Sequence, residues 1–214
     1  MLKLDGVVPP AIVAGAALVL LAWRYVSSRG SGQVDVAIVA ILIAITGLLE
    51  WRMGRPPTYR HGPVRLWSGD INSDQNSQQV ADPYTFTHII HGAAFYGLTT
   101  LVMPRAALGA RAIVAMALES SWEAYENTDT VVNRYRAATI SLGYYGDSLI
   151  NSLSDILACA LGFLLAWRLP RSATFAWVIA IEIILAFWIR DNLTLNIIML
   201  LHPFKFIRRW QMGA

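Results

Sequence analysis

The sequence predicts an all-α membrane protein, a polytopic bundle of about six transmembrane helices followed by a short C-terminal helix. Composition is the first reason. Of 214 residues, 56% are hydrophobic and only 14% are charged, a balance that would leave large apolar patches uncovered on a soluble domain. The second reason is that apolar runs of about twenty residues, the length that crosses about 30 Å of hydrocarbon, recur along the chain.

These runs define the expected spans, which together with their loops form a single integral membrane domain. The spans cover residues 8–27, 36–53, 83–104, 107–128, 146–168 and 173–190. The first run lacks the small-residue cleavage pattern of a signal peptide, so we expect it to be retained. After the last span, the apolar part of residues 193–207 is short for a crossing and predicts a re-entrant or interfacial helix.

Two long polar loops, expected at residues 54–82 and 129–145, separate the spans unevenly. With six spans, both loops, the N-terminus and the segment after the last span lie on one side, here called the polar side. The short loops of the opposite side are rich in Arg, which favours the cytoplasm for them and the non-cytoplasmic face for the polar side. Raw counts of Lys and Arg favour the reverse orientation.

Charge and cysteine content exclude some functions. The formal net charge is only +3 and no basic domain lies outside the spans, which excludes nucleic acid as a partner. The single Cys159 cannot form an internal disulfide. Membrane lipid is the expected partner, and association with a second copy of the chain or with another membrane subunit is left open.

Three expected spans carry polar residues at the end that faces the polar side. Helical spacing places each set on one face of its helix, and the sets are His88 and His91; Glu119, Glu123 and Glu126; and Asp147, Asn151 and Asp155. A rise of about 1.5 Å per residue predicts two levels of depth. The upper level holds His88, Glu123 and Asn151, and the deeper level holds His91, Glu119 and Asp155.

Ionisable groups inside a membrane cost several kcal/mol each unless they are paired, protonated or hydrated, so this coincidence predicts a functional site. We expect the six residues of the two levels to form it. A divalent metal such as zinc, manganese or iron is a candidate cofactor, with His91, Glu119 and Asp155 as its ligands. Without metal, the crowded carboxylates would share protons and suit acid and base catalysis. The alternative is a structural core of interhelical hydrogen bonds.

Three arginines on the polar side are candidates for binding a lipid headgroup. Arg134 and Arg136, in "NRYR", could hold a phosphate or carboxylate between two guanidinium groups, and Arg190 lies at the end of the last span. Arg near a membrane surface is also a common topology anchor. Glu182 lies alone in the middle of the last span, and either faces lipid in its protonated form or contributes to the site from a fourth helix.

The leading hypothesis is therefore an intramembrane site that binds or acts on a lipid or lipid-linked headgroup, with or without a divalent metal. A second hypothesis is a transporter or binding protein coupled to protons or cations, and a third is a structural or assembly subunit of a membrane complex. The far halves of these spans, such as "AFYGLTTLVM", carry almost no ionisable residue, which argues against a continuous pore.

Five motifs carry a resemblance to a known family: "SQQVADPYTFTHIIHG", "ESSWEAYENTD", "NRYRAATISLGYYGDSLINSLSD", "RLP" and "IRDNLTLNIIML". Over residues 47–211 the chain resembles a family of bacterial multi-pass membrane proteins with a domain of unknown function. The resemblance implies a protein of the bacterial inner membrane and draws attention to Asn127 in addition to the polar residues above. A looser likeness to VanZ-like proteins covers only the fourth and fifth spans.

Overall fold

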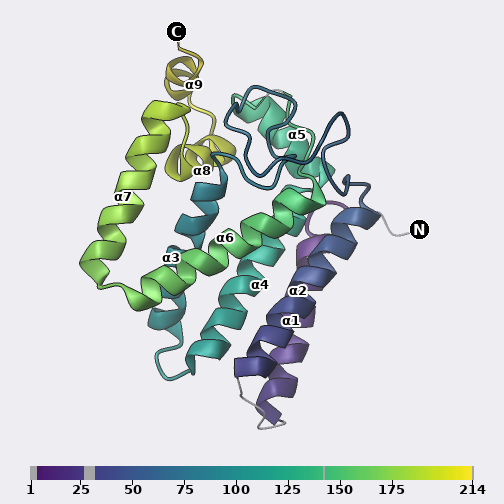
Figure 1. Ribbon diagram of the computed structural model, residues 1–214, viewed down its shortest axis with the longest axis vertical. Helices are drawn as coiled ribbons and strands as arrows, with labels where there is room; N and C mark the ends of the chain where they lie inside the picture. Colours follow the sequence, from purple (N-terminus) through teal and green to yellow (C-terminus); the bar gives the residue numbers. More distant parts are fainter. Residues whose placement is uncertain (1–3, 27–31, 142, 214) are drawn as a thin grey trace.

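The computed structural model describes residues 4–26, 32–141 and 143–213, which form helices joined by loops, with no strand among them. Six long helices run through the bundle (Figure 1). They are α1 (Val8–Val26), α2 (Gly32–Arg52), α3 (Thr85–Val102), α4 (Leu108–Glu126), α6 (Leu149–Arg168) and α7 (Arg171–Trp188). Three short helices, α5 (Asp129–Ala138), α8 (Leu193–Leu201) and α9 (Lys205–Met212), gather at one end.

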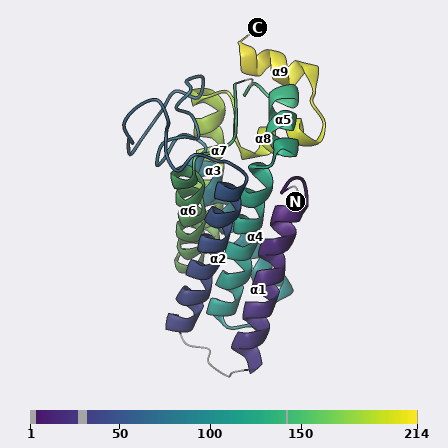
Figure 2. The same ribbon diagram turned by 90° about the vertical axis from the view of Figure 1, so that its right-hand side faces the viewer.

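The long helices correspond in position to the expected spans. Four of them, α1, α2, α6 and α7, are long and apolar enough to cross a membrane. Helices α3 and α4 have 18 and 19 residues and run alongside these in the bundle (Figure 2), so a crossing by all six stays a prediction. Helix α7 lies at the edge of the bundle and exposes large apolar side chains such as Phe175 and Phe187, as expected for contact with lipid.

The polar side predicted from the sequence is one end of the bundle. Both polar loops, α8, α9 and the C-terminus lie there in both views, next to the N-terminal end of α1 (Figures 1 and 2). Residues 129–145 differ from the expected loop because their first part is helix α5. The Thr128 side chain accepts a hydrogen bond from the Val131 N–H and begins this helix, and the apolar Val132 and Tyr135 are buried.

The helix that follows the last long helix is short for a crossing, as the sequence predicts. Helix α8 has nine residues, which rise about 14 Å, less than half of the hydrocarbon thickness. The N-terminus of α8 contacts Glu182 of α7. The Glu182 carboxylate accepts hydrogen bonds from the backbone N–H groups of Leu193 at 3.0 Å and Thr194 at 3.1 Å. Glu182 therefore joins α7 to the first turn of α8, where a negative charge is favourable.

The largest contact between two helices joins α3 and α6, which cross at two glycines. A Cβ atom on Gly92 of α3 would overlap the backbone carbonyl of Cys159, and one on Gly162 of α6 would overlap that of Ile89. Small residues of this kind allow two backbones to approach closely inside a membrane. The crossing holds the histidine-bearing turn of α3 against α6.

The long loop between α2 and α3 completes the N-terminus of α6. The backbone N–H groups of Leu149 and Ile150 donate to the carbonyls of Pro56 at 2.8 Å and Pro57 at 3.2 Å. Ser148 caps the same turn through its side chain, which accepts from the Asn151 N–H at 3.3 Å. Helix ends leave such N–H groups without a partner in the helix, so this loop stabilises the end of α6 that carries the predicted site.

Candidate functional site

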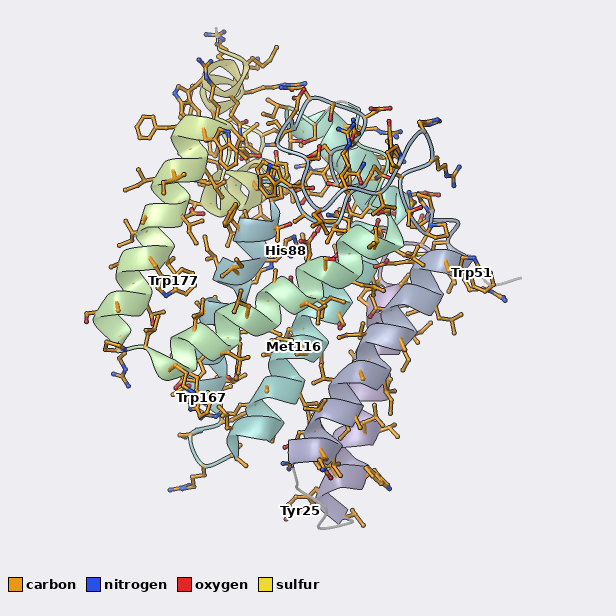
Figure 3. The ribbon with its side chains drawn as sticks, in the orientation of Figure 1. Tyr25, Trp51, His88, Met116, Trp167 and Trp177 are labelled. Atoms are coloured by element: carbon orange, nitrogen blue, oxygen red, sulfur yellow. The ribbon has the colours of Figure 1, made fainter. Side chains whose placement is uncertain are left out.

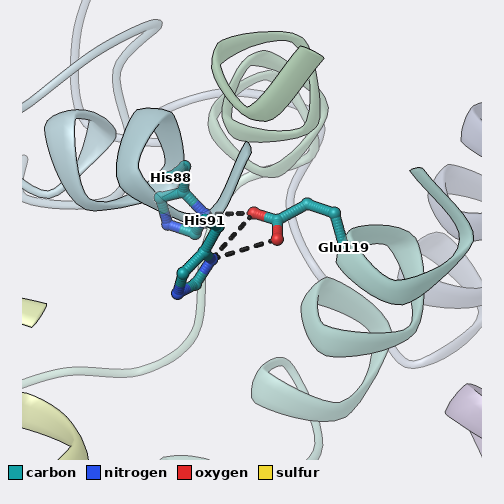
Figure 4. A group of neighbouring side chains, drawn as sticks. All are labelled: His88, His91 and Glu119. Carbon is teal, nitrogen blue, oxygen red and sulfur yellow. Dashed lines mark hydrogen bonds and ion pairs between the residues drawn. The ribbon is translucent and has the colours of Figure 1, made fainter. Parts of the chain in front are cut away.

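Two histidines of α3 and one glutamate of α4 meet below the polar end of the bundle (Figures 3 and 4). The Nδ1 atom of His88 lies 2.5 Å from Oε1 of Glu119, and Nδ1 of His91 lies 3.0 Å from Oε2 of the same carboxylate. Glu119 is 0% exposed. Spacing of three residues turns both rings toward α4, as the helical pattern predicts.

Two further carboxylates surround His88. Oε1 of Glu123, one turn above Glu119 on α4, lies 3.2 Å from Nδ1 of His88. Oδ2 of Asp155 on α6 lies 3.8 Å from Nε2 of His88. The three predicted polar faces therefore converge. The two depth levels are not separate, because His88 of the upper level contacts Glu119 and Asp155 of the deeper one.

The group formed by His88, His91 and Glu119 could hold a metal ion. One candidate ligand atom from each residue lies within 4.8 Å of the other two. Two imidazoles and one carboxylate are a donor set used by zinc and by iron(II), and such a set leaves coordination positions open. The structure thus groups His88 with the predicted His91 and Glu119, whereas Asp155 faces the other ring nitrogen of His88.

Asp147 lies closer to the polar end and is held by residues of two other segments. The Asn127 side chain donates to its Oδ2 at 2.9 Å, and the Tyr144 hydroxyl donates to its Oδ1 at 3.0 Å. The Asn127 carbonyl also accepts from the Asp147 N–H at 2.7 Å. These contacts join the start of α6 to the end of α4 and to the loop after α5.

A cavity of about 610 Å³, called the main cavity because the histidines and carboxyl groups line it, connects these groups. Its polar lining includes His88, His91, Glu126, Asp147 and Asp155, and Asn151 lies among them. Apolar side chains from α3, α4 and α8 line another part of it; they are Ala94, Phe95, Leu118, Leu193, Ile197 and Leu200. Leu118 and Ile197 are 39% and 47% exposed. The cavity therefore joins a polar interior to an apolar outer surface.

A buried apolar cluster lies between the cavity and the far end of the bundle. It is formed by Ala115, Met116, Ile156, Cys159 and Phe163. Figure 3 shows Met116 farther from the polar end than His88. None of these five side chains carries a strongly polar group, since Cys159 behaves as a small apolar residue when it is buried.

The three predicted headgroup arginines lie outside this cavity. Arg134 donates to the Leu200 carbonyl at 2.7 Å, Arg136 donates to the Tyr144 carbonyl, and Arg190 donates to the Trp210 carbonyl at 3.5 Å. Arg134 also lines a neighbouring cavity of about 660 Å³. These contacts join the short helices and loops of the polar end, and headgroup binding by the arginines stays a prediction.

A buried acid that was absent from the predicted set lies on α2. Glu50 on α2 is 0% exposed, and its Oε1 accepts a hydrogen bond from Ser152 of α6 at 2.6 Å. Its signal in the sequence was an acidic residue inside an apolar run, "GLLEWR", at the end that faces the polar side. Glu50 does not line the main cavity, so we assign it to the α2–α6 contact.

Asp191 ties three segments of the polar end together. It accepts hydrogen bonds from the Tyr84 hydroxyl at 3.1 Å, the Gln211 side chain at 3.0 Å and the Asn192 N–H at 2.9 Å. Burial is the main cause that raises the pKa of Asp191 from 3.8 to about 6; the hydrogen bonds, including one with Asn196, oppose it, and Glu182 adds to it.

We expect Asp191 to make the protein less stable as the pH rises. Because its pKa is higher in the folded state than in the unfolded state, its stabilising contribution is complete below about pH 4 and is lost as the pH rises through about 6. The loss corresponds to about 3 kcal/mol. The uncharged Asp191→Asn variant, in which the Tyr84 hydroxyl can turn and accept, should match wild type near pH 4 and be more stable at pH 8. Thermal unfolding in detergent at both pH values measures this, and a variant less stable at pH 8 would contradict it.

Comparison with known proteins places the chain in a family. Residues 50–213 match DUF2585, described as a protein of unknown function. The UPF0314 protein of Paracoccus denitrificans is 47% identical over 188 residues, which cover 88% of this chain and 96% of that protein. The UPF0314 protein of Sphingopyxis alaskensis is 46% identical over 187 residues, 87% of this chain and 97% of that protein. No solved structure matches the chain. The match covers the candidate site and most of the helices, and the chain belongs to the DUF2585 family.

Proposed function

We propose that this protein binds the headgroup of a membrane lipid or lipid-linked molecule in the main cavity and acts on it with a divalent metal ion. His88, His91 and Glu119 would hold the ion. The observation that carries the proposal is the position of these three residues, which line or adjoin a cavity that is polar inside and apolar at its outer surface. An amphiphile has the same division, so its headgroup and its chains would each meet a matching surface.

The residues around the proposed ion suit chemistry on a headgroup. A bound zinc or iron ion would polarise an oxygen atom of the ligand. Asp155 and Glu123 lie within 4 Å of His88 and are the groups placed to accept or donate a proton there. Asn151 lines the cavity beside them and would orient the headgroup by hydrogen bonding. We place this site in the bacterial inner membrane, on the non-cytoplasmic side.

Two observations favour this proposal over the alternatives. The apolar cluster around Met116 lies in the path that a transported ion or proton would need beyond the cavity. A purely structural core would satisfy its polar groups internally, yet the Nδ2 group of Asn151, which is 1% exposed, has no hydrogen-bond partner among the described residues. A buried donor of this kind supports a site that receives a ligand.

Metal analysis of the purified protein tests the proposal. We expect about one equivalent of a divalent metal in the wild type, and at least a tenfold loss in His91→Ala, since removing a ligand destroys the site. His202→Ala is the matched control, because His202 is exposed after α8 and outside the cluster. Absence of stoichiometric metal from wild-type protein purified without chelator and reloaded with zinc or iron would exclude the metal site. Equal loss in both variants would exclude its location.

A further inference from the structure

The main cavity is lined by carboxyl groups. Glu126, Asp147 and Asp155 line it, and Glu119 and Glu123 lie directly behind His88. Within the described part of the chain, no Lys or Arg lines this cavity. A divalent ion at His88 and His91 would leave the carboxyl groups of Glu126 and Asp147 as further partners for a cation. The cavity is therefore suited to a positively charged group and poorly suited to an anion.

Aromatic rings form part of the cavity lining. Tyr135 and Tyr144 have ring centroids 5.1 Å apart, and Trp122 and Tyr125 have centroids 6.2 Å apart. All four line the cavity, together with Tyr84. Rings attract cations through their faces, and aromatic residues grouped around a pocket recognise quaternary ammonium ligands. Carboxylates and rings around one space thus point to the same ligand chemistry, an organic ammonium group.

The unpaired amide of Asn151 gives an independent indication of a ligand. Its side chain lines the cavity, is almost fully buried, and donates to no described residue through Nδ2. Leaving such a donor without a hydrogen bond is unfavourable. An oxygen atom of a bound molecule would remove that cost. The cavity therefore has a buried hydrogen-bond donor that is available to a bound molecule.

The neighbouring cavity places a cation beside the main cavity. It shares Trp122, Tyr125, Ile197 and Leu200 with the main cavity, so the two are adjacent along the same wall. Arg134 lines only the neighbouring cavity, where its hydrogen bonds to the carbonyls of Leu200 and Leu201 fix the guanidinium. A fixed cation beside a cavity lined by carboxyl groups matches a ligand that has one negative and one positive group a short distance apart.

We propose that this site selects zwitterionic phospholipids, with the ammonium group in the main cavity, the phosphate beside Arg134, and the acyl chains across Leu118 and Ile197. The inference deepens the proposed function, on which it rests, by naming the class of lipid. Phosphatidylcholine and phosphatidylethanolamine have the required headgroup. Phosphatidylglycerol has the same phosphate and chains without the ammonium group, which makes it the matched competitor.

Lipid retention tests the selectivity. Purified wild-type protein in maltoside micelles is incubated with an equimolar mixture of the three phospholipids, and the retained lipid is identified by native mass spectrometry. We expect at least a tenfold preference for the two zwitterionic lipids. Glu126→Gln should reduce the preference several-fold by removing a charge that lines the cavity. Asp70→Asn, a change of the same charge in the exposed part of the loop between α2 and α3, should leave it unchanged.

Lipid selectivity and lipid binding can be overturned by different results. Retention of the three lipids in equal amounts, or preference for phosphatidylglycerol, would overturn the selectivity and leave lipid binding intact. Retention of no lipid would overturn both. Arg134→Gln should weaken retention of all three lipids alike, because each carries a phosphate. If Glu126→Gln is poorly folded, Trp122→Leu removes a ring from the cavity wall without changing charge and should reduce the same preference.

Discussion

Glu119→Gln is expected to lose at least nine-tenths of the bound metal while keeping the helix content of the wild type. The Glu119 carboxylate contacts the Nδ1 atoms of both His88 and His91. A glutamine of the same shape supplies one acceptor oxygen and one NH₂ group, so it cannot serve both imidazoles and is a poor metal ligand. Elemental analysis measures the metal, and circular dichroism measures the helix content.

Glu50→Gln is the matched control for this change. Glu50 is also a fully buried glutamate at the same end of a long helix, but it has a single hydrogen bond, from Ser152. The amide oxygen of glutamine can accept that bond, so metal content should stay at the wild-type level. Full metal content in Glu119→Gln would show that this carboxylate neither binds the ion nor orients the two histidines.

Gly162→Ala is expected to destabilise the protein strongly and to lower its metal content as well. The new Cβ atom would overlap the backbone carbonyl of Ile89. A backbone carbonyl cannot move aside as the end of a side chain can. The loss of folding free energy should therefore be at least the value of about 1–3 kcal/mol that is typical of overpacking. Ile89 lies between His88 and His91, and separation of α3 from α6 would move both rings. Thermal unfolding in detergent and metal analysis measure the two effects.

The chain offers the same substitution at a site with open space. Gly97 lies on α3, and a Cβ atom there would meet nothing within 4 Å. Gly97→Ala should therefore leave metal content unchanged and stabilise the helix by about 0.5–1 kcal/mol, because alanine loses less conformational freedom than glycine. Equal melting temperatures for the Gly97 and Gly162 variants would contradict the close crossing of α3 and α6.

Helical spacing was sufficient to predict which residues share a face. Residues three or four apart lie on the same side of a helix. His88 and His91 therefore share one face of α3. Glu119 and Glu123 share the face of α4 that contacts it. The position of the polar end could be predicted for a similar reason, since the apolar runs place their polar residues toward the same side. These inferences depend on local periodicity, which a single sequence contains.

Which of these side chains contact each other could not be predicted. The depth of each residue was estimated as if the helices were straight and parallel, and that estimate does not include the angle at which they cross. Helix α6 runs obliquely across α3 in Figure 1, and the glycines of the crossing set the distance between them. Consequently Asp155 meets His88 and not the residues assigned to its own level. Glu182 was ambiguous for the same reason, since its partners lie on the following helix, whose return toward α7 depends on tertiary structure.

The contact of the long loop with α6 has a consequence for how the chain is made. Pro56 and Pro57 leave the ribosome well before Leu149 and Ile150. The carbonyls of the two prolines accept hydrogen bonds from the N–H groups of these later residues. The acceptors are thus already present on the polar side when α6 enters the membrane, and the last span of the site can complete its first turn on arrival. Synthesis in the opposite order, as in a circular permutant that begins at α6, would expose those N–H groups until the loop followed.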